Sequence, residues 1–322
     1  VEFARGSLVY QRQGALLAQP FDPDTLAVTG DAEQVAESVG SNRGTGNAPF
    51  SVSGAGVLVY RSGSTPAIKL AWADVAGRAL GTTGELSNYQ GVDLSPDGRN
   101  VVVHRHVGAG GDIWILDSQR GTASNLTLDA AVHHLSPCWA GEQHVAYAKA
   151  VSGGTEFWWR PTGGGAEEKL HAISLPGSHF LTDCRGPAIL FSQTERDTGL
   201  DIWALPVQGD RTPRRLLGDK FNETQGQLSP DGRWLAYQSD ETGRFEVYVQ
   251  SYPPRGEDKV PVSAAGGAYP RWRPDGRALF YLSLDGKLSR GDVAVVEGAL
   301  RVERSVTLFD MDPVLNNGPL SQ

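Results

Sequence analysis

The sequence predicts an all-β protein, a β-propeller of four-stranded antiparallel blades. Three observations lead to this prediction. A turn followed by an apolar strand recurs along the 322 residues, and two series of aromatic or branched residues recur with a period in the low forties. Gly and Pro are abundant, with 40 and 19 copies, as expected where many hairpins must turn.

The clearest copy of the repeat is LSPDGRWLAYQSDETGRFEVYVQ, from Leu228 to Gln250. Pro230 pre-sets φ for a tight turn, Asp231 can bond its own backbone, and Gly232 accepts the left-handed conformation. WLAYQS and FEVYVQ have the branched and aromatic content of two strands. WRPDGRALFYLS, LSPDGRNVVVHR and SVSGAGVLVYRS repeat the turn and the first strand. The unit is therefore predicted to be a β-meander.

The repeats keep a constant spacing at two positions. In the first strand, intervals of 43, 44, 44, 46 and 44 residues separate Tyr60, Val103, Tyr147, Phe191, Tyr237 and Tyr281. In the second strand, intervals of 44, 45 and 45 residues separate Trp114, Trp158, Trp203 and Tyr248. A period in the low forties with four short strands is typical of a propeller blade.

Seven blade-like repeats, the first of them truncated, are expected to form a single propeller of six or seven blades over residues 1–309. The expected repeats are approximately 1–40, 48–84, 89–127, 132–170, 178–217, 222–262 and 268–309. Residues 310–322, rich in Pro, Asn and Gly, are expected to be a tail or linker. The chain begins at Val1 inside an expected strand, which suggests an excerpt of a longer protein and leaves open whether the ring closes within it.

This repeat resembles the TolB-like (WD-repeat-like) β-propeller repeats of bacteria. The resemblance rests on the SPDG turn before an apolar strand that ends in Tyr, followed by DIW or EVY, and it extends from Gly6 to Phe309. ALLAQPFDPDTLAVTGD, FSVSGAGVLVYRSG, FNETQGQLSPDGRWLAYQSDETGRFEVYV and YPRWRPDGRALFYLS further resemble the propeller region C-terminal to bacterial Ser/Thr protein kinases. The resemblance implies the sensor or scaffold part of a larger bacterial protein, in an extracytoplasmic or cytoplasmic location.

Charge and composition exclude several classes of partner. The formal net charge is −8, and no run of Lys or Arg interleaves with aromatic residues, so nucleic acid is not expected as a partner. No stretch of 18 or more apolar residues occurs, so this part of the chain is not expected to insert into a membrane. As an isolated domain it is expected to be monomeric. Cys138 and Cys184 lie one repeat apart; two buried thiols are expected, with an inter-blade disulfide as the alternative.

No motif commits the chain to catalysis, and no cofactor is predicted. The G-x-S-x-G nucleophile elbow, H-E-x-x-H, C-x-x-C and the P-loop are all absent from the sequence. The turn residues Asp97, Asp231 and Asp275 recur for a structural reason, because a carboxylate at that position satisfies backbone N–H groups of the turn.

Five histidines are more suggestive of a site. His104 and His106 lie at i and i+2 near the end of one apolar strand, so they point to the same side. His133 and His134 begin the inner strand of the fourth repeat, and His179 begins that of the fifth. Strand ends and the starts of their antiparallel neighbours share an edge, so the five could gather at one mouth of the central channel. Such a cluster would suit a metal or an anionic ligand; the alternative is dispersed loop-end histidines.

Equivalent positions in other repeats carry Tyr89, Gln90, Glu223, Gln225 and Tyr269. A polar, aromatic mouth would suit a protein segment or a small polar ligand. The predicted function is therefore a non-enzymatic binding platform. Two alternatives stay open: a lyase-like enzyme with a histidine-lined metal site at the propeller mouth, and the propeller of a peptidase whose hydrolase domain lies outside this sequence.

Overall fold

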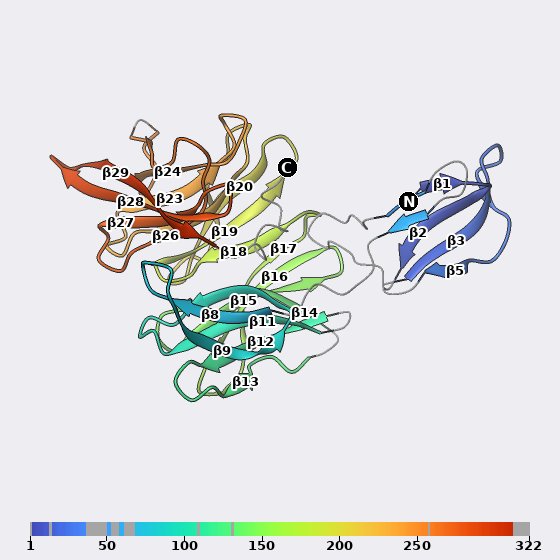
Figure 1. Cartoon of the computed structure of the whole chain (residues 1–322), viewed down its shortest axis with the longest axis horizontal. Coiled ribbons are helices and arrows are strands. Elements are labelled where there is room, and N and C mark those ends of the chain that lie inside the picture. Colours follow the sequence, from blue (N-terminus) through green and yellow to red (C-terminus); the bar gives the residue numbers. More distant parts are fainter. Residues whose placement is uncertain are drawn as a thin grey trace. The chain divides into compact units, whose positions relative to one another are not determined.

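The computed structural model describes residues 2–12, 15–36, 50–52, 58–60, 68–107, 110–129, 132–256 and 258–311 (Figure 1). Every helix or strand within these ranges is a β-strand, so the all-β prediction is confirmed. No described segment forms a helix that is long and apolar enough to cross a membrane. Of the expected tail, only its first two residues, 310 and 311, fall within the described part.

The chain forms two compact units: Val1–Ile68 with Leu86–Asn88, and Lys69–Glu85 with Tyr89–Gln322. In the first unit β1, β2 and β3 form a meander, β4 and β5 both pair with β3, and β6 pairs with β7. Its strands are β1 (Glu2–Ala4), β2 (Ser7–Arg12), β3 (Ala15–Asp22), β4 (Ala27–Val28), β5 (Glu33–Ala36), β6 (Phe50–Val52) and β7 (Leu58–Tyr60). The buried side chains of Val9, Leu16 and Ala36 form its core.

The second unit contains most of the hairpin β8 (Ile68–Ala73)–β9 (Ala79–Ser87), followed by successive four-stranded meanders. The first two meanders are β10 (Tyr89–Leu94), β11 (Asn100–Val107), β12 (Gly110–Asp117), β13 (Ala123–Asn125), and β14 (His133–Ala140), β15 (His144–Val151), β16 (Gly154–Pro161), β17 (Glu168–Ile173). The next are β18 (His179–Asp183), β19 (Ala188–Glu195), β20 (Gly199–Pro206), β21 (Arg214–Leu217), and β22 (Glu223–Leu228), β23 (Trp234–Ser239), β24 (Glu246–Ser251), β25 (Val260–Pro261). The last is β26 (Ala268–Trp272), β27 (Ala278–Leu282), β28 (Lys287–Val296), β29 (Ala299–Asp310).

The first strand of each meander is its inner strand, and the inner strands β10, β14, β18, β22 and β26 contact one another in order. Each has a β-bulge in its pairing with the second strand. Four of the bulges hold a residue with a left-handed backbone: Gly91, Ser136, Gln225 and Tyr269, with φ of 69°, 48°, 57° and 54°. A bulge bends the strand and turns its side chains, so neighbouring inner strands can be linked through side chains.

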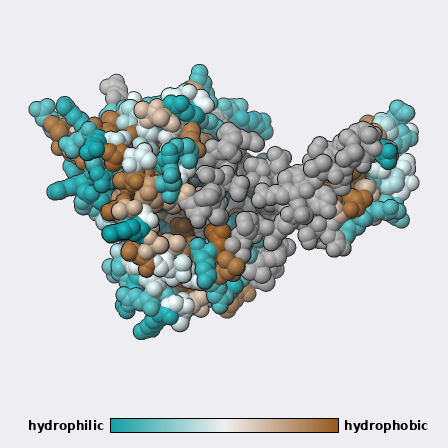
Figure 2. Space-filling view, viewed as in Figure 1, coloured by the Kyte–Doolittle hydropathy of each residue, from teal (hydrophilic) through white to brown (hydrophobic). Residues whose placement is uncertain are grey.

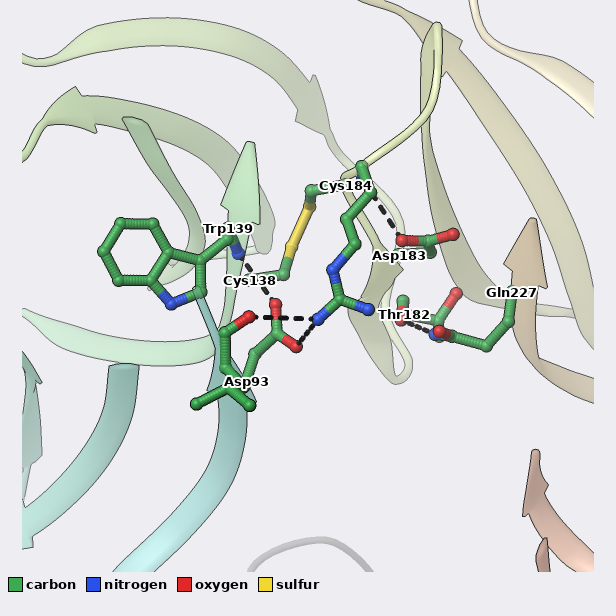
Figure 3. The surroundings of a disulfide bond; sticks show 9 residues. Asp93, Cys138, Trp139, Thr182, Asp183, Cys184 and Gln227 are labelled. Carbon is green, nitrogen blue, oxygen red and sulfur yellow. Dashed lines mark hydrogen bonds and ion pairs between the residues drawn. A yellow bond between two sulfur atoms is a disulfide. The ribbon is translucent and has the colours of Figure 1, made fainter. Parts of the chain in front are cut away.

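These links join residues that lie one repeat apart (Figure 3). A side chain of one inner strand bonds the backbone of the next or the preceding one: Asp93 Oδ2 accepts the Trp139 N–H at 2.9 Å, and the Trp272 indole N–H donates to the Gln227 carbonyl at 3.2 Å. The linked pairs are Asp93–Trp139, Thr182–Gln227, Asp183–Leu228 and Gln227–Trp272. These hydrogen bonds fix the position of each inner strand relative to the next.

A disulfide makes the same kind of link between Cys138 and Cys184. The expectation of two free buried thiols is therefore wrong. The bulged inner strands bring the two Cα atoms to 5.8 Å, within the range that a disulfide requires. The sequence spacing alone did not reveal this approach.

The turn aspartates each accept the backbone N–H two residues further on. The N···O distances are 3.0, 3.1 and 3.0 Å for the pairs Arg99–Asp97, Arg233–Asp231 and Arg277–Asp275. The hydroxyl groups of Ser95 and Ser229 also donate to Asp97 and Asp231. In the third copy Arg273 takes the place of the serine and forms an ion pair with Asp275.

Packing between neighbouring meanders forms the core of the second unit. Phe157 and Phe191, fully buried on neighbouring meanders, meet edge-on with ring centroids 5.0 Å apart. Trp114 and Trp158, two of the recurring aromatic residues, lie on the third strands β12 and β16 and are only partly buried; Arg105 and Lys149 lie over their rings. On the visible surface, hydrophobic residues are scattered among hydrophilic ones (Figure 2).

The disulfide predicts a specific loss of stability. Replacing both cysteines, Cys138→Ser with Cys184→Ser, should lower the free energy of unfolding by about 2–4 kcal/mol, because the bond closes a long loop in the unfolded chain. Urea denaturation of the wild type with and without reductant, beside the double variant, measures this. Reductant should shift the wild-type midpoint and leave the double variant unchanged. A wild-type midpoint that is insensitive to reductant would contradict the link.

Candidate functional site

Three of the five predicted histidines come together. His104, His106 and His133 each offer one ring nitrogen, and these atoms lie within 4.8 Å of one another. The centroid of the His133 ring is 5.2 Å from that of His104 and 5.3 Å from that of His106. The two histidines of β11 are 5.8 Å apart. The cluster therefore joins the β10–β13 meander to the β14–β17 meander.

Strand register explains why these rings meet. His106 pairs with Gly111 in the β11–β12 ladder, and Gly111 pairs in turn with His133 through the one bridge between β12 and β14. Residues directly opposite in adjacent strands project to the same side of a sheet. Gly111 stands between the two histidines and has no side chain, so the imidazoles can approach each other across it.

Gly111 also makes room for His104. A Cβ atom at Gly111 would lie 2.1 Å from His104 Nε2 and 2.8 Å from its Cδ2. His104 is only 2% exposed, and its Nε2 atom is buried without a hydrogen-bond partner. Burial, reinforced by the neighbouring His133, His106 and His134, lowers the pKa of His104 to about 3. At neutral pH this ring is therefore an uncharged donor of a nitrogen lone pair.

The other two predicted histidines lie outside the cluster. His134 is on the opposite side of β14 from His133, with Nδ1 3.5 Å from Asp112 Oδ1, and it lines a cavity of about 320 Å³ with Lys149, Arg160 and Glu167. His179 Nδ1 is 3.2 Å from Thr155 Oγ1, and the ring is buried. Burial lowers the pKa of both histidines.

The remaining predicted mouth residues differ in exposure. Gln90 is exposed and lies opposite His104 in the β10–β11 pairing. Gln225 and Tyr269 are half-buried at two of the bulges. Tyr89 and Glu223 are buried. Burial, reinforced by the charge of Asp219, raises the pKa of Glu223 to about 7.

Sequence reasoning missed a group of charges along the inner strands. Asp93 accepts a hydrogen bond from Arg185, which follows Cys184 and so belongs to the meander after next (Figure 3). Arg271 of β26 interacts electrostatically with both Asp93 and Asp183. Burial raises the pKa of the two carboxyl groups, and Arg185 opposes this shift. Only the approach of inner strands from different repeats reveals this group.

Gly111 was also missed, although the sequence holds a signal for it. An acidic residue recurs near the start of the third strand, at Asp112, Glu156, Asp201 and Glu246. The residue immediately before it is Thr155, Leu200 or Phe245 in the later repeats, and Gly111 in this one. A glycine where other repeats carry a side chain indicates close approach of another group.

Comparison with known proteins identifies the fold. No protein-family model matches the chain. An uncharacterised protein of Agrobacterium fabrum is 23% identical over 240 residues, which cover 73% of this chain and 76% of that protein. TolB from Acinetobacter baumannii superposes with a TM-score of 0.59 at 16% identity, covering 94% of this chain and 78% of that one. A putative TolB from Agrobacterium tumefaciens gives 0.55 at 19% identity, covering 73% and 84%. The chain therefore has the fold of the TolB-like β-propellers, as the repeats predicted.

Enzymes share this fold. An oligogalacturonate lyase from Vibrio parahaemolyticus is 13% identical with a TM-score of 0.52, covering 82% of this chain and 85% of that one. A prolyl endopeptidase is 10% identical with a TM-score of 0.51, covering 95% of this chain and 50% of that one. The fold is thus compatible with both binding and catalytic proteins.

The buried His104 predicts a pH dependence of stability. Its folded-state pKa of about 3 lies below the ordinary value of 6.5, so between these values the unfolded chain binds more protons than the folded one. Stability is therefore unaffected above pH 6.5 and falls as the pH drops toward 3. In EDTA, urea denaturation of His104→Gln from pH 7 to 4 should show a shallower fall, by up to about 1 kcal/mol per pH unit. A fall as steep as in the wild type would contradict this.

Proposed function

We propose that this chain is a non-enzymatic binding propeller, which recognises a protein segment or a small polar ligand at the channel mouth where the inner strands begin. By resemblance it would be the sensor or scaffold part of a larger bacterial protein, such as a Ser/Thr kinase. The TolB-like fold supports a rigid platform for the residues that would contact the ligand.

The observation that carries this proposal is the pair of left-handed residues Gln225 and Tyr269. The equivalent bulge position in β10 is Gly91, which adopts a positive φ without strain. Gln225 and Tyr269 accept the same conformation with a side chain, at φ of 57° and 54°, which costs about 1–3 kcal/mol each. Both side chains are half-buried. Strain of this kind is typical of ligand-binding positions, where a side chain is held ready for contact.

The disulfide supports a position outside the cytoplasm. Disulfides form and persist in oxidising compartments such as the bacterial periplasm, whereas cytosolic thiols are kept reduced. A sensor that samples an extracytoplasmic ligand would fit both the Cys138–Cys184 bond and the resemblance to kinase-associated propellers.

The proposal predicts binding that depends on the bulge side chains. A random displayed-peptide library panned against the immobilised chain should yield binding peptides. Their affinity should fall at least about tenfold for Tyr269→Ala, because this variant loses an aromatic anchor of the interface. Gln225→Ala should weaken the same peptides less. Fluorescence titration with the synthetic peptides measures both effects.

A matched control separates recognition from general stickiness. Tyr10→Ala removes a tyrosine from the first unit, where its hydroxyl donates to Gln19, and should leave peptide affinity unchanged. If the enriched peptides bind Tyr269→Ala as tightly as the wild type, the proposal that the channel mouth is the binding site is overturned. The parent gene sequence on either side of this region shows directly whether a kinase or a hydrolase domain accompanies it.

A metal-assisted lyase is the second candidate, and the three-histidine cluster favours it. The Vibrio protein with this fold is an oligogalacturonate lyase. Incubating the chain with oligogalacturonate and a divalent metal, and following the ultraviolet absorbance of the unsaturated product, distinguishes the candidates. Turnover that disappears in His133→Ala would establish the enzyme; no turnover would leave the binding platform.

A further inference from the structure

We infer that His104, His106 and His133 together bind one divalent transition-metal ion, which links the β10–β13 meander to the β14–β17 meander. This inference is independent of the proposed ligand-binding function, since it rests on the histidine cluster and not on the bulge residues. The expected ion belongs to the zinc, copper and nickel class.

The donor set selects this class of ion. Imidazole nitrogen suits Zn²⁺, Cu²⁺ and Ni²⁺, whereas Mg²⁺ and Ca²⁺ require oxygen ligands. The three ligand atoms lie within 4.8 Å of one another. Zn–N bonds of about 2.0–2.1 Å place tetrahedral ligand atoms about 3.3–3.4 Å apart, so small rotations of the rings bring them into coordination. Three histidines leave at least one coordination position for a further donor.

The buried Nε2 atom of His104 has no hydrogen-bond partner within the described part of the protein. Buried polar atoms in native structures are almost always bonded to a partner, yet His104 Nε2 has none. The fold itself does not require an imidazole at this position, since alanine or serine occupies its place in the next repeats: Ala148 and Ser192 are each 0% exposed. Ser192 is satisfied by Thr224 at 2.7 Å. A metal ion would supply the partner that His104 lacks.

The cluster is also peculiar to one junction between meanders. His106 pairs with Gly111, the second residue of the third strand β12. At the equivalent position of the next two meanders stand Ala150 and Thr194, which pair with Thr155 and Leu200. Ser178 and Asn222 stand in the place of His133, just before the next inner strands. Asn222 is held there by Asp240. The repeat therefore folds without histidine at these positions, and their concentration at one junction indicates a ligand.

The glycine between the histidines leaves room for the His104 ring. At the equivalent position of the next meander, Thr155 has a side chain that contacts His179. At Gly111 the His104 ring takes up that space, with Nε2 only 2.1 Å from where a Cβ would stand. The backbone at Gly111 is not left-handed, so the glycine is required for space and not for conformation.

The experiment titrates the full chain, with any polyhistidine tag removed and residual metal stripped with EDTA. Calorimetry with Zn²⁺, and Cu²⁺ electron paramagnetic resonance, should show one ion per chain with imidazole nitrogen ligands. Stoichiometric Zn²⁺ should raise the melting temperature, because it binds the folded state. His106→Ala and His133→Ala should each abolish saturable binding, and Gly111→Ala should weaken it about 10–100-fold by displacing His104.

The control is His144→Ala, which removes a histidine outside the cluster whose ring centroid lies 5.1 Å from that of Trp159. It should keep full metal affinity, and circular dichroism melts in EDTA verify that each variant folds. No saturable binding by the wild type would overturn the inference, as would binding that survives in the His106→Ala, His133→Ala double variant. Either negative result leaves the peptide-binding test of the mouth untouched.

Discussion

The structure of the second unit depends on how one inner strand is attached to the next. Within each meander the strands hydrogen-bond to one another. Because repeats of this kind contact only their neighbours, the unit is held together by the interfaces between successive meanders. The bulge in every inner strand turns a side chain toward the adjacent strand, and a hydrogen bond or a covalent bond completes the link. Asp183, whose oxygen accepts the Leu228 N–H at 2.8 Å, and the Cys138–Cys184 bond are two chemical solutions to the same constraint.

The same links position charged side chains beside them. Arg185 follows Cys184 directly, so the disulfide fixes the backbone from which the guanidinium reaches Asp93. The Arg185 side chain is exposed and that of Asp93 is half-buried, and removing a carboxylate from water is costly unless it keeps good partners. Asp93 keeps two, the guanidinium of Arg185 and the N–H of Trp139. Losing either partner would leave this half-buried carboxylate incompletely paired.

Local signals made the fold predictable, because the turns and strands of one blade are contiguous in the sequence. SPDG fixes a hairpin through Asp231 and its neighbours, and the spacing of Tyr147 and Phe191 reports the period. The disulfide was not predictable, because it depends on how closely two bulged strands approach. The five predicted histidines separated for a similar reason. Alternation along β14 sends His133 and His134 to opposite sides, and a sequence without strand registers cannot tell which of them meets His104.

A repeat protein supplies its own reference for what the fold requires. Positions that carry alanine, serine or threonine in neighbouring meanders show what packing alone demands there, and Ala148 is such a position. His104 departs from that reference at a cost, since a buried imidazole with an unbonded nitrogen lowers stability. Gly111 departs from it in a complementary way, by removing the side chain that would exclude the imidazole. Gly111 leaves the space that His104 needs, and the proposed metal ion would give the unbonded His104 nitrogen a partner. The proposed metal site therefore lies at the junction where His104, His106 and Gly111 depart from the neighbouring repeats.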